Sequence, residues 1–208
     1  MNGVVVVGGG GHAKVVLATL LAADFSVEGI LDDNETKWGR KIFDIPILGP
    51  LEMLRSGKFV RAVVAVGDNK MRKKIVEDFG GCCEWVTAVH PHSFVSQDVR
   101  IGKGTVVFAG TVIQPGTAVG DHVIINTGVT VDHDCTVGDF VHLAPGVHLA
   151  GSVVVEEGSF LGIGSVVIPE KSVGCWATVG AGAVVIRDVP PLTTVVGIPA
   201  KPVLGEKK

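Results

Sequence analysis

The 208-residue sequence contains no tyrosine, and aromatic residues make up only 5% of it. A core built from bulky aromatic rings is therefore excluded. Glycine, in contrast, occurs 29 times. Because glycine permits backbone conformations and close approaches that other residues do not, this composition indicates many tight turns.

Clustered charge and long apolar runs are also lacking. The formal net charge is −3 and the basic residues are scattered, which excludes the clustered basic face of a nucleic-acid-binding protein. No apolar run reaches the roughly 18 residues of a membrane span, so we expect none. The sequence opens without a positively charged leader and cleavage site. The four cysteines are then interpreted as reduced thiols, and we expect a cytoplasmic protein.

Residues 1–86 are predicted to form a small α/β domain. Short segments at residues 4–7, 27–31 and 62–66, rich in Val, Ile and Leu, have the length of strands, and helical patterns follow the first and the third. This alternation of strands and helices predicts a small parallel sheet. With about 86 residues, the domain corresponds to one mononucleotide half of a Rossmann fold rather than to two.

Residues 87–208 follow a period of six. From Val89 to Val185, all seventeen residues at this spacing are Val, Ile or Leu. A six-residue period fits neither an α-helix nor simple strand alternation, and it is typical of a parallel β-helix built from hexapeptides. Three hexapeptides form one triangular coil, so residues eighteen apart stack in successive coils about 4.8 Å apart.

One short segment of this β-helix, residues 131–142, contains two histidines, three aspartates and a cysteine. Cys135 falls on an inward position of the repeat, where a desolvated thiol is inert. His133 and Asp134 fall at the adjacent corner and are expected to point outward. His142 lies nine residues from His133, on the opposite side of the same coil. A site that uses both histidines therefore needs two chains.

His133 is the candidate general base. Neighbouring carboxylates at Asp132 and Asp134 raise the basicity of an imidazole and fix its tautomer. Gly151 lies one coil above, at 133 plus 18, where its N–H can stabilise a developing oxyanion. A base with an oxyanion donor one layer away is a minimal acyl-transfer site.

The remaining histidines of the β-helix do not converge with His133 in this register. A metal site needs several converging ligands, so none is expected within one chain, and a metal shared between chains is the alternative. Four histidines are interpreted as solvated or hydrogen-bonded corner residues: His90, His92, His122 and His148.

The glycines at residues 8–11 follow the first predicted strand and precede the first helix. With Ala13 they form the Gly-x-Gly-x-x-Ala pattern that holds a pyrophosphate at a helix N-terminus. Asp32 and Asp33 close the next strand, where an acidic residue contacts a ribose, although helix capping is the alternative for both. The half-size domain and the large His12 at the helix start argue against NAD and favour a nucleotide-linked substrate.

The sequence contains the motifs GGGGHAK, ILDD, VGDNKMRKKI, DHDC and VGIPAK, at residues 8–14, 30–33, 66–75, 132–135 and 196–201. Together they resemble the bacterial hexapeptide-repeat acetyltransferases of nucleotide-linked amino sugars, close to the sialic-acid O-acetyltransferase-like branch. The resemblance covers nearly the whole chain and implies a homotrimer of left-handed β-helices with acetyl-CoA between neighbouring helices. The expected fold is therefore an α/β half-Rossmann domain, residues 1–86, followed by a left-handed parallel β-helix, residues 87–208.

The resemblance also implies roles for individual residues. His133 would take a proton from the sugar amine, and Asp134 stands where the family carries a glutamate that raises the basicity of this histidine. His142, Gly151 and Ile163 would contact acetyl-CoA. Six residues of the N-terminal domain would hold the nucleotide-sugar: Gly10, Gly11, His12, Asp32, Asp33 and Gly67.

We therefore predict an enzyme that transfers the acetyl group of acetyl-CoA to the 4-amino group of a nucleotide-linked 4-amino-4,6-dideoxyhexose. UDP is favoured over GDP as the nucleotide, and no metal is expected. O-acetylation of sialic acid or another sugar is the main alternative. A metal-dependent lyase similar to the γ-class carbonic anhydrases and a non-catalytic nucleotide-sensing scaffold are the other two.

Overall fold

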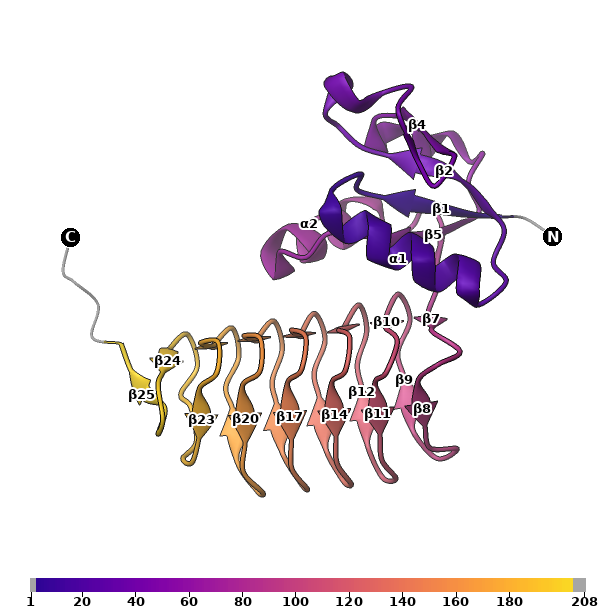
Figure 1. Cartoon of the computed structure of the whole chain (residues 1–208). Helices are drawn as coiled ribbons and strands as arrows, with labels where there is room; N and C mark the ends of the chain where they lie inside the picture. The colour runs from indigo at the N-terminus through magenta and orange to yellow at the C-terminus, as the bar shows by residue number, and fades with distance from the viewer. Residues whose placement is uncertain (1–2, 204–208) are drawn as a thin grey trace.

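The computed structural model of the protein describes residues 3–203, with an α/β part above a long β-helix (Figure 1). The α/β part contains strands β1 (Val4–Val7), β2 (Val27–Leu31), β3 (Lys41–Ile42), β4 (Ile45–Gly49), β5 (Arg61–Val64) and β6 (Glu84–Trp85), helices α1 (Gly11–Ala22) and α2 (Asn69–Phe79), and 3₁₀ turns η1 (Glu35–Lys37) and η2 (Leu51–Ser56). Its strand order is β3-β4-β2-β1-β5-β6, and every pair except β3–β4 is parallel. The predicted parallel sheet is confirmed.

Both helices of the α/β part begin at the carboxyl edge of this sheet. The four valines of β1 are fully buried, which is why this strand occupies an inner position. α2 begins after Asp68, whose carboxylate accepts a hydrogen bond from Met71 N at 2.7 Å and caps the helix. α1 begins at Gly11 without a side-chain cap, so its first N–H groups are not taken by a capping side chain.

The β-helix has three faces of short parallel strands. The face beneath the α/β part, here called the docking face, contains β7 (Ala88–Val89), β10 (Val106–Val107), β13 (Ile124–Ile125), β16 (His142–Leu143), β19 (Phe160–Leu161), β22 (Thr178–Val179) and β24 (Thr194–Val196), with β25 (Lys201–Pro202) antiparallel at its end. The second face contains β8 (Phe94–Val95), β11 (Val112–Ile113), β14 (Thr130–Val131), β17 (His148–Leu149), β20 (Val166–Val167) and β23 (Val184–Val185). The third face contains β9 (Arg100–Ile101), β12 (Ala118–Val119), β15 (Thr136–Val137), β18 (Val154–Val155) and β21 (Ser172–Val173).

The six-residue period corresponds to the interior of this β-helix. Strands eighteen residues apart pair in register, as Val107 does with Ile125 and Ile125 with Leu143. From Val107 to Val185 every sixth residue is buried in one continuous apolar core. The expected left-handed parallel β-helix is therefore confirmed.

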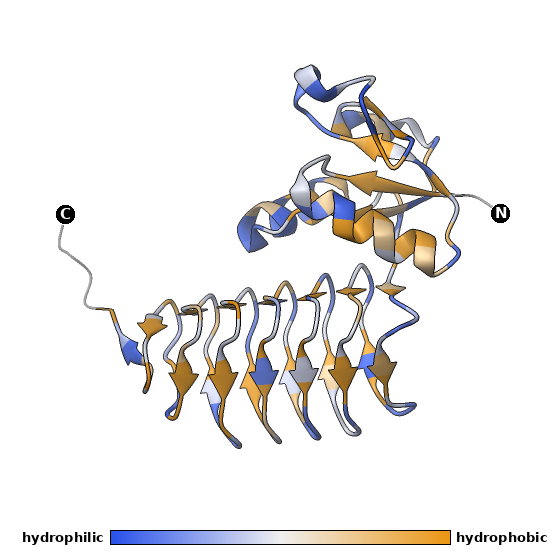
Figure 2. Cartoon of the chain, viewed as in Figure 1, coloured by the Kyte–Doolittle hydropathy of each residue, from blue (hydrophilic) through white to orange (hydrophobic). Residues whose placement is uncertain are grey.

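The α/β part packs on the docking face through α1. Leu17 and Leu20 of α1 belong to the same buried cluster as Val106, Phe108 and Ile124 of the β-helix. Figure 2 shows the mostly apolar helix α1 lying over the β-helix. The two parts therefore share a core, and each covers apolar surface that the other would expose to water.

Residue 86 lies between β6, the last strand of the first sheet, and β7, the first strand of the β-helix. We propose this position as the boundary between domains 1–86 and 87–208. In residues 3–203, neither helix has the length and apolar character needed to cross a membrane.

Candidate active site

His133 lies at the corner between β14 on the second face and β15 on the third. Its side chain is 60% exposed, and its Nδ1 lies 2.8 Å from Asp134 Oδ2. Asp134 has a left-handed backbone conformation (φ 59°), which aspartate tolerates better than most residues. Its carboxylate, one methylene shorter than that of glutamate, thus reaches the imidazole.

The carboxylate partner determines which nitrogen of His133 acts as a base. A carboxylate only accepts hydrogen bonds, so Nδ1 carries the proton and Nε2 presents its lone pair. The hydrogen bond to Asp134 and then the charge of Asp132 raise the pKa of His133. The exposed ring is therefore a stronger base than a free histidine.

Gly151 lies directly against the imidazole of His133. A Cβ atom at this position would lie 2.6 Å from both Nε2 and Cε1 of His133, so any side chain would displace the ring. Ser152 N donates to His133 O at 2.9 Å, which holds the two coils in register. Within residues 3–203 no acceptor is bonded to the Gly151 N–H. The base and a free backbone donor are thus adjacent.

Cys135 packs in the interior of the β-helix, as predicted. Its side chain is 1% exposed in the apolar interior, and Sγ lies 3.2 Å from Ala150 O. Burial is the main cause that raises the pKa of this thiol, so a thiolate nucleophile is disfavoured.

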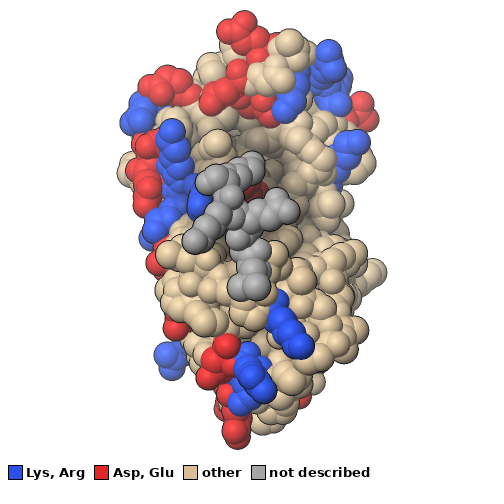
Figure 3. All heavy atoms as spheres, turned by 90° about the vertical axis from the view of Figure 1, so that its left-hand side faces the viewer, with Lys and Arg blue, Asp and Glu red and all other residues tan. Residues whose placement is uncertain are grey.

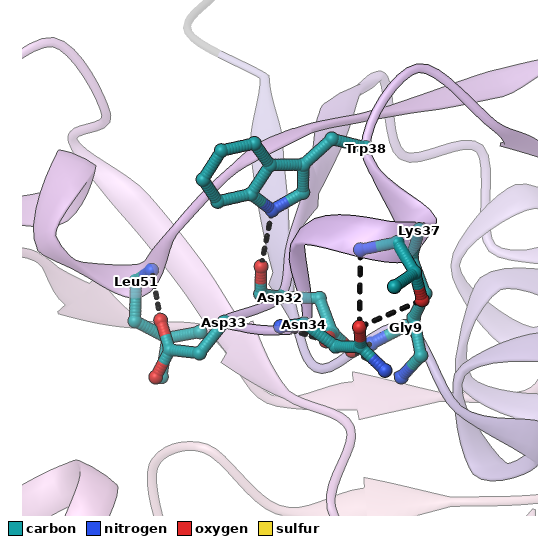
Figure 4. A network of polar contacts seen from close by, with 8 residues as sticks. Gly9, Asp32, Asp33, Asn34, Lys37, Trp38 and Leu51 are labelled. Atoms are coloured by element: carbon teal, nitrogen blue, oxygen red, sulfur yellow. Dashed lines mark hydrogen bonds and ion pairs between the residues drawn. The ribbon is translucent and has the colours of Figure 1, made fainter.

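Asp32 holds the glycine loop of the α/β part (Figure 4). Its Oδ2 accepts hydrogen bonds from Gly9 N and Lys37 Nζ, both at 2.7 Å, and its Oδ1 accepts one from Asn34 N at 2.9 Å. Burial opposes ionisation, but the hydrogen bonds from Lys37, Asn34 and Gly9 outweigh it and lower the pKa of Asp32. Both carboxylate oxygens are thus engaged within the chain, and direct contact of Asp32 with a nucleotide stays a prediction.

Asp33 and the glycines at the start of α1 are more open. Asp33 Oδ1 accepts from Leu51 N at 2.8 Å, and the residue is exposed. Gly10 and Gly11 are also exposed, with no atom within 4 Å of the position of a Cβ. These three residues therefore have room for a ligand, and their role stays a prediction.

A cleft of about 430 Å³ separates the α/β part from the later coils of the docking face. Figure 3 shows the surface hollowed between the upper part and the β-helix below it. The eight residues that line the cleft come from both parts: Gly67, Asp68, Asn69 and Lys70 above, and Gly158, Phe160, Trp176 and Thr178 below. Gly67 is thus the one predicted nucleotide-sugar residue in its lining.

His142 requires a correction. We expected this side chain on the side opposite His133 and offered to a neighbouring chain. It does lie on the docking face, but it is only 9% exposed because its own α/β part covers it. Nδ1 contacts Gly67 O at 3.1 Å, and Nε2 contacts Asn126 Nδ2 at 3.3 Å. Its role as a cofactor contact stays a prediction.

His12 lies beside His142, with ring centroids 6.1 Å apart. Burial, and then the charge of Arg72, lower the pKa of both histidines to about 4. Both rings are therefore neutral at neutral pH. Ile163 is 58% exposed at a corner of the β-helix, and its contact with acetyl-CoA also stays a prediction.

The interpretation of His122 as a solvated or hydrogen-bonded corner residue is wrong. Its side chain is 1% exposed, and neither ring nitrogen has a hydrogen-bond partner among the described residues. The ring stacks on Phe140 at 5.3 Å between centroids and meets the edge of Trp85 at 5.5 Å. It is buried because the α/β part covers this corner.

Sequence reasoning missed Arg72, which is 1% exposed between the two parts of the molecule. A signal was present, because Arg72 shares the spacing of Ile75 and Phe79, the apolar residues on the buried side of α2. In the described part of the chain, no three His, Cys, Asp or Glu side chains come together as a metal site.

The histidine–carboxylate pair beside a backbone N–H provides a general base and an oxyanion donor, the two parts of a minimal acyl-transfer site. Similar proteins specify the class further. Residues 3–79 match the PglD N-terminal domain family. The chain is 40% identical over 113 residues to UDP-N-acetylbacillosamine N-acetyltransferase of Bacillus subtilis. This alignment covers 52% of the chain, and the chain spans about half of the length of that relative (52%).

Several solved structures match almost the whole chain, among them the following two. One is a mutant of perosamine N-acetyltransferase from Caulobacter crescentus in complex with CoA and GDP-perosamine. It is 42% identical, with a TM-score of 0.93, over 99% of this chain and 98% of that chain. The other is the acetyltransferase domain of PglB from Neisseria gonorrhoeae in complex with acetyl coenzyme A. It is 38% identical, with a TM-score of 0.90, over 98% and 100%. The chain belongs to the hexapeptide-repeat acetyltransferases of nucleotide-linked amino sugars.

Proposed function

We propose that this protein transfers the acetyl group of acetyl-CoA to the 4-amino group of a nucleotide-linked 4-amino-4,6-dideoxyhexose. The observation that carries the proposal is the pairing of His133 with Asp134 against the free N–H of Gly151. The relatives support the substrate class, since one is named for a UDP-linked sugar and another was solved with a GDP-linked one. We retain UDP as the favoured nucleotide and GDP as its competitor.

The proposed mechanism is a direct attack of the sugar amine on the thioester carbonyl. A C–N bond forms, the carbonyl oxygen becomes an oxyanion beside the Gly151 N–H, and His133 Nε2 takes a proton from the nitrogen. Asp134 stabilises the imidazolium that results. The intermediate then collapses, the C–S bond breaks, and the leaving thiolate takes the proton from His133. The products are the amide and free CoA thiol.

We also propose that the active enzyme is a homotrimer in which two chains form each site. His133 stands at the corner opposite the docking face, whereas the cleft and the glycine loop lie on the side of that face. Within one chain the base and the nucleotide-sugar are therefore held on different sides of the β-helix. If a neighbouring chain places its His133 at the cleft, the base and the nucleotide-sugar meet in one site.

Mixed trimers test the sharing of sites between chains. His133→Ala removes the base, and Gly11→Asp puts a carboxylate at the start of α1, where a Cβ meets no other atom but a diphosphate would be repelled. We expect each variant alone to be nearly inactive. Random 1:1 mixing should restore about one quarter of the wild-type activity, because half of the chains supply each intact element. Activity that stays at the level of the single variants would contradict shared sites.

A substrate panel tests the proposed activity itself. Purified protein is given acetyl-CoA with UDP-linked or GDP-linked 4-amino sugars, or with free sialic acid, and the release of free thiol is followed. We expect turnover only with a nucleotide-linked amine. Turnover with sialic acid alone would instead establish O-acetylation, and a lack of thiol release with every acceptor would reject the proposal.

A further inference from the structure

Arg72, on α2, is the largest side chain that is fully buried in the described part of the chain. Its guanidinium donates hydrogen bonds to oxygen atoms of both parts of the molecule. From Nε it reaches His122 O (2.9 Å), from Nη1 it reaches Val66 O (3.1 Å) and Gly67 O (3.3 Å), and from Nη2 it reaches Phe140 O (2.7 Å), Asn69 Oδ1 (2.9 Å) and Val141 O (3.4 Å).

None of these partners is a carboxylate. Taking a cation out of water costs several kcal/mol unless its donors are satisfied, and here all bonds go to neutral oxygens. Among the described residues, the carboxylate of Asp68 alone raises the pKa of Arg72 by its charge, and the larger effect of burial lowers this pKa to about 10. A cation in this position is therefore explained by geometry, since the five N–H groups of arginine spread in one plane to several acceptors at once.

The acceptors join the rim of the cleft to the β-helix. Val66 and Gly67 follow β5 at the carboxyl edge of the sheet, and Gly67 lines the cleft. His122 and Phe140 occupy the same corner in two successive coils. The guanidinium thus fixes the distance between the loop after β5 and the β-helix beneath it.

Asn69 extends this connection by one coil. Its Oδ1 accepts from Arg72, and its Nδ2 donates to Gly158 O at 3.0 Å and Ser159 O at 3.1 Å. Gly158, in turn, lines the lower side of the cleft. Both walls of the cleft are therefore bonded, directly or through Asn69, to one buried guanidinium.

We propose that Arg72 is a positioning residue for the nucleotide-sugar cleft. It sets the position of the Gly67 rim against the β-helix, without touching the substrate itself, because it is sealed from solvent. The inference rests on the proposed function insofar as the cleft is the nucleotide-sugar site. It predicts that loss of the guanidinium weakens nucleotide binding while acetyl-CoA binding is preserved.

The test compares Arg72→Lys and Arg72→Met with Lys73→Met as the matched control. Lys73 is one residue further along α2 and also bridges the two parts, through an ion pair with Glu157, but it does not bond the Gly67 rim. Binding of UDP, GDP and acetyl-CoA to the full-length proteins is measured by calorimetry. KM values for the nucleotide-sugar and acetyl-CoA are measured in parallel.

For both Arg72 variants we expect nucleotide affinity to fall by about tenfold to a hundredfold, the size of effect that a small misplacement of a site produces. Acetyl-CoA affinity should change less than about twofold, and Lys73→Met should leave both affinities at wild-type values. Lysine keeps the charge but loses the planar fork, so it tests geometry in a variant that is more readily folded than Arg72→Met.

Two results would overturn the inference. One is a nucleotide affinity that stays at the wild-type value in Arg72→Lys while Arg72→Met also folds, because the guanidinium would then position nothing. The other is an equal loss of nucleotide and acetyl-CoA affinity, which indicates general destabilisation. Wild-type protein that binds nucleotide but transfers no acetyl group would reject the proposed function alone, and the affinities would still decide the role of Arg72. Wild-type protein that binds neither UDP nor GDP would reject the inference.

Discussion

Replacement of His133 by alanine is expected to lower turnover by about 10²-fold or more, the contribution typical of a general base. The side chain is 60% exposed, and in the described part of the chain it is bonded only to its neighbour Asp134, so the fold should not change. KM for the nucleotide-sugar should change little, because the residues predicted to bind it belong to the α/β part, whereas His133 belongs to the β-helix. Steady-state kinetics with thiol detection provide the measurement, and the elution volume of the variant is compared with that of the wild-type protein.

Two further variants separate basicity from geometry in this prediction. The proposed base acts only in its neutral form, so we expect activity to be lost as pH falls through the raised pKa of His133. Asp134→Asn removes the carboxylate that contributes most to the raised pKa of His133. The acidic limb of the pH profile should therefore move to lower pH. Gly151→Ala should displace the ring without affecting the backbone. Full turnover in His133→Ala would exclude this residue as the base.

Acidification from pH 7 to pH 5 is expected to lower the free energy of unfolding by several kcal/mol. His12, His122 and His142 each have a pKa of about 4 in the folded protein, mainly through burial, against an ordinary value of 6.5. Between these values the unfolded chain binds more protons than the folded one, so stability falls as pH falls. At pH 5 each histidine contributes a loss of about 2 kcal/mol.

The matched variant for this prediction is His122→Phe. Within residues 3–203 neither ring nitrogen of His122 has a hydrogen-bond partner. Phe140 adopts nearly the same left-handed backbone one coil away, with φ of 58° against 55°. The variant should therefore fold. Its free energy of unfolding should fall less between pH 7 and pH 5 than that of the wild-type protein, by the contribution of one histidine. Urea unfolding followed by circular dichroism at pH 7 and pH 5 measures both. Equal stability of the wild-type protein at the two pH values would contradict the prediction.

The β-helix was predictable because its constraint is local and repeated. One residue in six must fill the interior of each coil, so the seventeen aliphatic positions reveal the period, the register and the inward side of Cys135. The pairing of His133 with Asp134 was predictable for the same reason, since the residues are adjacent. Gly151 followed from the eighteen-residue spacing of stacked coils, and the structure places it against the imidazole.

The contacts between the two parts of the molecule were not predictable in the same way. Arg72 is bonded to Phe140, 68 residues away, and His142 to Gly67, 75 residues away. No periodicity relates such positions, and a charged side chain is ordinarily assigned to the surface. The burial of His122 and His142 was not predicted, because the α/β part covers one face of the β-helix and a register within the β-helix alone does not reveal this.

The sequence by itself thus determined the β-helix, its coil register and the histidine–carboxylate pair at one corner, because each depends on residues that are adjacent or in register. The tertiary structure alone decided which face the α/β part covers, which histidines are buried and neutral, and how the cleft is held. These features depend on the docking of two apolar surfaces far apart in the chain, and on a buried guanidinium that bonds to both.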